Sequence, residues 1–102
     1  MQRPAYPLAL GLLALILGSG CGGIWYTSRV LTVESKVEQA KEIGAEMYSP
    51  YEYYLAKEHL IKAQEEAAHA DYSDAIDLLD EAEVFAKKAI EQTGAVRKGA
   101  GR

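Results

Sequence analysis

The sequence contains little of what most binding and catalytic sites require. It has one cysteine in 102 residues, so no internal disulfide can form and no cysteine-based zinc site can be assembled. Its net charge is −4, from 11 basic and 15 acidic residues, so it offers no general attraction for a phosphate backbone. We therefore expect no nucleic-acid binding. The length allows at most one small domain.

Charged residues are absent from a long N-terminal stretch. Arg3 is followed by the apolar run Leu8–Leu17 (LALGLLALIL) and then by the small residues Gly18-Ser19-Gly20 before Cys21. This order of basic start, apolar segment, small residues and cysteine is typical of a bacterial lipoprotein signal. We therefore predict a signal peptide or anchor over residues 1–20. Lipidation of the Cys21 thiol would attach the chain to the membrane.

Two other interpretations of this segment stay open, because Gly18 occupies the position at which a lipoprotein signal usually has leucine. Cleavage just before the cysteine would release a secreted chain. Alternatively, residues 8–26 are uncharged, end in Trp25 and Tyr26, and are about long enough to remain as a transmembrane anchor. All three interpretations place the rest of the chain outside the cytoplasm. An aspartate after the lipidated cysteine commonly keeps a lipoprotein in the inner membrane, but here Gly22 follows Cys21. We therefore expect the protein to be in the outer membrane, facing the periplasm.

Residues 30–93 have the composition and periodicity of packed helices. Alanine, glutamate, lysine and leucine dominate, strand signals are almost absent, and apolar residues recur every three or four positions. We predict helices over about 28–47 and 50–70, a reversing turn over 69–72, and a third helix that ends before Gly94. Connections this short force neighbouring helices to be antiparallel. The residues expected to be buried are Val30, Val33, Val37, Ala40, Gly44 and Met47 in the first helix, Tyr53, Ala56, Leu60, Ala63, Ala67 and Ala70 in the second, and Ala75, Leu79, Ala82, Ala86 and Ala89 in the third. The predicted fold is all-α, a three-helix antiparallel bundle.

Specific residues predict where these helices begin and end. Ser49-Pro50 and Glu52 match a capping box with proline at the first helical position. Asp71, with Asp74 three residues later, matches a weaker cap for the third helix. Gly94 is a natural stop.

Composition divides the chain into four parts. Residues 94–102 (GAVRKGAGR) are basic and rich in glycine, and we expect them to be disordered. Before this tail come the signal or anchor over residues 1–20, a linker over residues 21–29 and the bundle over residues 30–93.

Two stretches resemble known sequence patterns. Residues 70–76 (ADYSDAI), followed by Ala82, resemble the turn and helix of a tetratricopeptide repeat, although a single repeat cannot bury its apolar face alone. Residues 40–89, above all 44–53 (GAEMYSPYEY), resemble an uncharacterised helical domain of bacterial envelope lipoproteins, which sometimes precedes an OmpA-like domain. The resemblance implies a helical, envelope-attached protein and supplies no catalytic residues.

The polar residues indicate neither a catalytic site nor a metal site. Glu66 and His69 form one E-x-x-H pair, whereas a di-iron bundle needs two such pairs and further glutamates. His69 falls at a helix end, where it suits a capping role, and we expect His59 on the solvated face. Neither a phosphate loop nor a nucleophile elbow occurs. We therefore expect no enzyme activity, no metal and no cofactor.

Four tyrosines gather where the first two predicted helices meet: Tyr48, Tyr51, Tyr53 and Tyr54. They either pack at the corner of the bundle or form a partner-binding patch, since tyrosine is enriched in interface hot spots. We expect a structural or adaptor lipoprotein that engages a periplasmic or envelope protein, and the small margin of stability of such a bundle leaves room for homo-oligomers. The alternative is a small periplasmic module for a ligand or peptide. Alanine-rich seams disfavour it, because closely packed helices leave little space between them.

Overall fold

The structure, a computed structural model, describes residues 6–100, without the side chains of residues 14–21. In that part of the chain the regular elements are the helices α1 (Tyr6–Glu42), α2 (Ala45–Tyr48), α3 (Pro50–Ala68) and α4 (Tyr72–Ala100). The predicted all-α class is confirmed. The turn expected near residues 69–72 is also where α3 ends and α4 begins.

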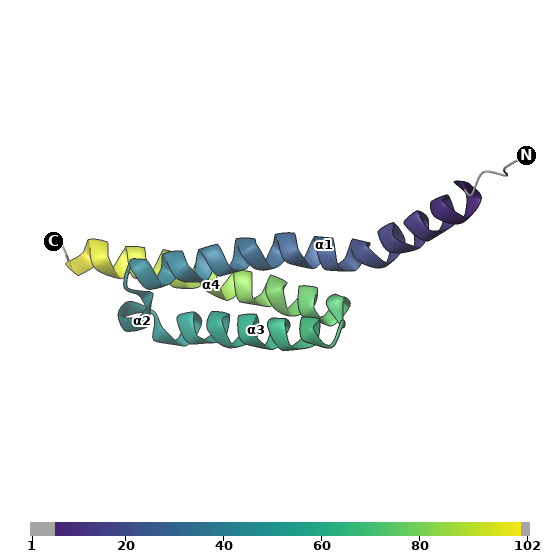
Figure 1. Cartoon of the computed structure of the whole chain (residues 1–102). Coiled ribbons are helices and arrows are strands. Elements are labelled where there is room, and N and C mark those ends of the chain that lie inside the picture. The colour runs from purple at the N-terminus through teal and green to yellow at the C-terminus, as the bar shows by residue number, and fades with distance from the viewer. Residues whose placement is uncertain (1–5, 101–102) are drawn as a thin grey trace, which may run out of the picture.

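The three long helices lie side by side over much of their length (Figure 1). α3 runs antiparallel to α1 and α4. α4 packs against both of its long neighbours, whereas α1 and α3 touch each other much less. The N-terminal part of α1 continues beyond the other helices, so the two ends of the chain lie at opposite ends of the molecule, with α2 at the end far from the N-terminus.

A seam of small residues holds these helices together. Ala82, Ala86 and Ala89 of α4 and Ala63 of α3 have no solvent-exposed surface, which brings the helix backbones close. The larger core side chains stand around this seam and include Val30, Val33 and Val37 of α1, Tyr53 and Leu60 of α3, and Leu79 of α4. The predicted three-four pattern of buried residues is therefore confirmed along most of each helix.

Both predicted ends of the first helix are wrong. In the structure, α1 starts at Tyr6, so the expected linker over residues 21–29 is helical. It stops at Glu42, and the chain then turns at Gly44, whose φ of +96° is disfavoured for a residue with a side chain. The turn reorients the residues that follow, and Met47, predicted to be buried, is 77% exposed.

Packing against α4 supports the helix at two of the glycines of α1. A glycine in a helix interior costs about 1 kcal/mol relative to alanine, yet Gly22 and Gly23 are helical. The ring of Tyr72 lies against both, and a Cβ atom at Gly22 would make a tight contact, 3.3 Å from Tyr72 Cδ2. The contact between α1 and the start of α4 therefore favours a small residue at Gly22, and it offsets the weak helix propensity of the two glycines.

The basic tail is helical as far as Ala100, so the predicted disorder over residues 94–102 is wrong for the described part of the tail. Gly94 does not stop the helix. Arg97 gives a reason for the extension, because its Nη1 donates to the carbonyl oxygen of Ile43 at 2.9 Å, just past the end of α1. Residues 101 and 102 lie outside the described residues.

The turn between α3 and α4 is a Schellman motif. The Asp71 N–H donates to the Glu66 carbonyl oxygen at 2.9 Å, and the Ala70 N–H donates to the Ala67 carbonyl oxygen at 2.9 Å. Ala70 occupies the left-handed position of this motif, with a φ of +60°. Its Cβ atom carries a steric penalty that glycine would avoid.

Replacing Ala70 with glycine should stabilise the fold by about 1 kcal/mol, because the residue is exposed and its strain is removed. Thermal melts of the full chain in mild detergent, followed by circular dichroism, should show a rise of about 4–8 °C. Gly44→Ala is the control with the opposite expected effect. A Cβ atom at this left-handed position would be strained and would lie 3.3 Å from the Tyr48 ring, so the melting temperature of this variant should fall. An unchanged or lower melting temperature for Ala70→Gly would contradict the turn geometry.

Candidate functional site

The predicted tyrosine cluster lies at the end of the molecule far from the N-terminus, on α2 and the start of α3 (Figure 1). Tyr48, Tyr51 and Tyr54 are 41%, 70% and 45% exposed. Tyr53 differs, because it is 2% exposed and belongs to the core. The surface therefore contains three of the four tyrosines, and we call this set (Tyr48, Tyr51 and Tyr54) the tyrosine corner.

The junction of α2 and α3 sets the direction of this corner. Ser49 is the N-cap residue of α3, and Pro50 holds the first helical position as predicted. The predicted capping box does not form, because the Ser49 side chain makes no hydrogen bond to the α3 backbone. Its hydroxyl instead donates to Glu52 Oε2 at 2.7 Å.

Gln92 of α4 completes a part-buried polar cluster with Ser49 and Glu52. The serine hydroxyl has a single proton, which goes to Glu52. Gln92 therefore presents its NH₂ group, which donates to Ser49 Oγ at 2.8 Å and to Glu52 Oε2 at 3.0 Å. The hydrogen bond from Ser49 holds the pKa of the Glu52 carboxyl below its usual range. These hydrogen bonds link the start of α3, where the tyrosine corner lies, to Gln92 of α4.

The exposed ring of Tyr54 is held on two sides. Its hydroxyl donates to Glu46 Oε1 at 3.1 Å, which joins α3 to α2 and raises the pKa of the Tyr54 phenol. Its ring meets the buried Tyr53 ring edge to face, with the centroids 5.2 Å apart. A shallow pocket beside it is lined by Pro50, Tyr51, Tyr54, Leu55 and Glu58. The corner therefore presents fixed aromatic surface next to carboxylates.

Cys21, the predicted lipidation site, lies within α1. Its side chain is outside the described residues. Within the described part of the chain, no helix has a stretch long and apolar enough to cross a membrane. α1 ends at Glu42, just before α2 and the tyrosine corner. At 1.5 Å per residue, this end of α1 is about 30 Å from Cys21 along the helix.

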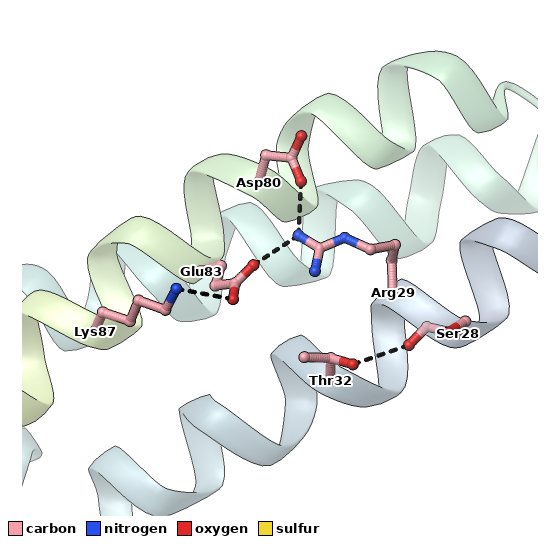
Figure 2. Close-up of polar contacts among 6 residues, drawn as sticks. All are labelled: Ser28, Arg29, Thr32, Asp80, Glu83 and Lys87. Carbon is pink, nitrogen blue, oxygen red and sulfur yellow. Dashed lines mark hydrogen bonds and ion pairs between the residues drawn. The ribbon is translucent and has the colours of Figure 1, made fainter.

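An ion-pair network that the sequence analysis missed joins α1 to α4, and Figure 2 shows its geometry. Arg29 Nη2 donates to Asp80 Oδ1 at 2.6 Å and to Glu83 Oε2 at 2.7 Å. The Nζ atom of Lys87 lies 3.2 Å from the other oxygen of Glu83. The Arg29 and Glu83 side chains are only 23% and 16% exposed. The hydrogen bond from Arg29 holds the pKa of Glu83 below its usual range.

His59 is not on the solvated face, as was expected, but lies half-buried between α3 and α4. Its Nε2 is 2.9 Å from Glu81 Oε2, and its Nδ1 is 2.8 Å from the Leu55 carbonyl oxygen. Its ring packs against Phe85, with the centroids 5.4 Å apart. The expectation was wrong because α4 covers this side of α3. His59 therefore joins two helices.

The E-x-x-H pair does not come together. His69 is exposed at the C-cap of α3, whereas Glu66 lies near Asp71 and Asp74, with the three carboxylates within 4.8 Å of one another. The Asp74 N–H donates to Asp71 Oδ1 at 3.3 Å, which is the predicted weaker cap. The charge of Asp71 raises the pKa of Asp74. Of the three acids, Asp71 therefore caps α4.

These features define a class of protein: a small all-helical domain built on an alanine seam, with three exposed tyrosines at one end. Residues 31–100 match the family described as "Domain of unknown function (DUF4398)", and the chain belongs to this family. The match covers α1 from Leu31 onward and all of α2, α3 and α4. The expected membership of an uncharacterised domain family is thereby confirmed. No curated protein and no solved structure matches the chain.

Glu83→Gln should destabilise the fold near neutral pH by about 1 kcal/mol, because it removes the charge that Arg29 and Lys87 face. The pKa of Glu83 is lowered in the folded state, so the parent's advantage should be constant down to the ordinary value of 4.5 and shrink as the pH falls further. Thermal melts at about pH 7, 5 and 3 measure this difference.

Glu91→Gln is the matched control for that experiment, since Glu91 is exposed on the same helix. It should change the melting temperature little at any of these pH values. A Glu83→Gln deficit that persists undiminished at the lowest pH would contradict the role given to the carboxylate charge.

Proposed function

We propose that this chain is a non-enzymatic lipoprotein of the bacterial cell envelope that acts as a structural or adaptor module through protein–protein contacts. A lipid on Cys21 attaches it to the outer membrane, facing the periplasm. In this proposal α1, α3 and α4 form one antiparallel three-helix bundle, in which α1 covers a tetratricopeptide-like hairpin of α3 and α4. The tyrosine corner is the surface that engages a protein partner.

The observation that best supports this proposal is the separation of the apolar N-terminal segment from the tyrosine corner. The described leucines of that segment are exposed, with Leu8 at 82% and Leu10 at 64%, and such side chains favour an apolar environment. The tyrosine corner lies at the far end of the bundle (Figure 1). A chain attached to the membrane through its N-terminal end would present the tyrosine corner, at the opposite end, to other envelope proteins.

The character of the tyrosine corner supports protein contacts over catalysis. Tyrosine rings supply large contact area and a polar tip, and they are enriched among the residues that dominate interface energies. The surrounding helices carry most of the 15 acids of the chain, so a partner with a basic surface would associate faster.

The alternative of a small ligand- or peptide-binding module has less support. The pockets among the described residues are open to solvent, and the seam alanines bring the helices too close for an internal site. A bundle held by an uncleaved transmembrane anchor is a further alternative, which the following experiment separates.

Cys21→Ser should abolish metabolic labelling with palmitate and leave an unprocessed precursor, because the thiol is the acyl acceptor. The measurement is labelling and electrophoretic mobility of the full chain in a bacterial host. Ser19→Ala is the matched control, since it changes a nearby small residue and keeps the thiol. Equal labelling of Cys21→Ser and parent would exclude lipidation at this position, and an unlabelled, uncleaved parent would favour the transmembrane anchor.

Replacing Tyr48 and Tyr51 together by alanine should weaken capture of a native partner by at least about 30-fold, which corresponds to about 2 kcal/mol of lost contact energy. Membrane localisation should not change. Pull-down from native membranes after crosslinking measures the loss, and higher salt should slow association more than it speeds dissociation.

The double variant Tyr48→Phe with Tyr51→Phe is the matched control, since it keeps both rings and removes only the hydroxyls. It should retain partners. An alanine double variant that keeps its melting temperature and every partner would show that the tyrosine corner is not the binding surface.

A further inference from the structure

An uncharged groove opens on the surface between α1 and the C-terminal half of α3, near the point where α1 extends beyond the bundle. None of the residues that line it is charged, although 25% of the chain is charged. Its lining combines the apolar and aromatic residues Ile24, Tyr26, Leu31, Ala67, Ala68 and Tyr72 with Gly23 and the polar residues Thr27, Ser28 and Gln64. We call this feature the α1–α3 groove.

The floor of the groove is fixed and its α1 wall is apolar. The rings of Tyr26 and Tyr72 meet there, with their centroids 5.8 Å apart. Ile24 and Leu31 stand on the α1 side and are 72% and 60% exposed. Leaving two large aliphatic side chains in water costs free energy that an apolar contact would recover.

The groove begins close to the proposed point of membrane attachment. Its first lining residues, Gly23 and Ile24, follow Cys21 within one turn of α1. At 1.5 Å per residue, Ile24 is about 5 Å from Cys21 along the helix. A lipid on Cys21 would therefore hold this end of the groove near the membrane surface.

The nearby charges do not line the groove. Glu66, Asp74 and Asp77 line a separate pocket formed by α3 and α4. Arg29, the first charged residue after the apolar segment, is directed to Asp80 and Glu83 of α4 (Figure 2). Glu34 of α1 is also close, because the groove residue Gln64 donates to Glu34 Oε1 at 2.9 Å, but Glu34 does not line the groove. The lining itself therefore carries no charge.

We propose that the α1–α3 groove lies against the lipid surface of the membrane, so that the bundle leans on the bilayer through this side. This inference rests on the membrane attachment proposed above. Its chemistry is that of an interfacial helix face, whose apolar side chains enter the boundary between headgroups and acyl chains to a depth of about 5–10 Å. Ile24 and Leu31 are about 10 Å apart along the helix, so both can reach this layer when α1 is tilted.

Fluorescence quenching of a single tryptophan tests this contact. Trp25 is the sole tryptophan of the chain. In a Trp25→Phe background, Leu31→Trp places the probe in the groove, and Val84→Trp is the matched control. Val84 is 51% exposed on α4 and follows Glu83, which pairs with Arg29, so it lies at nearly the same height along the bundle.

The full-length chain, purified from host membranes, is reconstituted in phosphatidylethanolamine vesicles that contain phosphatidylcholine with brominated acyl chains. Emission from Leu31→Trp should be quenched at least about twofold more than emission from Val84→Trp, because only the groove reaches the acyl boundary. Ala68→Trp, at an exposed position on the α3 wall, repeats the measurement from the other side of the groove. Circular dichroism confirms that each variant is helical.

Equal quenching at the groove and control positions, or quenching at neither, would overturn the inference. Flotation of the same samples with the vesicles separates the two possible failures. A chain that floats while its groove probes stay unquenched keeps the proposed membrane attachment and loses the lipid contact. A chain that does not float loses both.

Discussion

The close approach of α4 to its two long neighbours is the constraint on which the rest of the structure depends. Ala82, Ala86 and Ala89 are completely buried, and each covers little apolar area. The helices are therefore held by many close contacts along the seam, and a bulkier side chain would separate them. A core of this kind has almost no interior volume to give to a ligand. Any function must consequently reside on the surface or at the ends of the helices.

Polar contacts then fix the register of α1 against α4 at two places. Arg29 bonds to Asp80 and Glu83, and Arg97 donates to the Ile43 carbonyl oxygen near the other end of the contact. Each contact uses a charged donor, and such hydrogen bonds are stronger than those between neutral groups. The α1–α3 groove and the tyrosine corner are thus held at a constant separation. Membrane attachment near the α1–α3 groove would therefore set the distance of the tyrosine corner from the membrane.

The interior of the fold could be predicted from the sequence, whereas the ends of α1 and the C-terminal end of α4 could not. Burial along a helix follows its period, so the spacing of Val30, Val33 and Val37 already predicted the core face. The start of α3 at Pro50 was also predicted, because capping is local. The helical continuation through Gly22 depends on packing by Tyr72, and the continuation past Gly94 depends on the hydrogen bond from Arg97 to the Ile43 carbonyl oxygen. Tyr72 and Ile43 are both distant in sequence from the glycines concerned. Local propensity alone therefore gave the wrong ends.

The tyrosines show the same division between local and distant causes. Tyr53 shares the helical spacing of Ala56 and Leu60, which predicted its burial. The exposure of Tyr48 instead follows from the left-handed turn at Gly44, which sets the direction of α2. Helical periodicity does not predict the effect of such a turn. Tyr54 links the two sets, because its exposed ring packs against buried Tyr53 and its hydroxyl bonds to Glu46. A ring held in this way has already lost most of its rotational freedom before any partner arrives. Binding to it would cost less conformational entropy than binding to a free surface tyrosine.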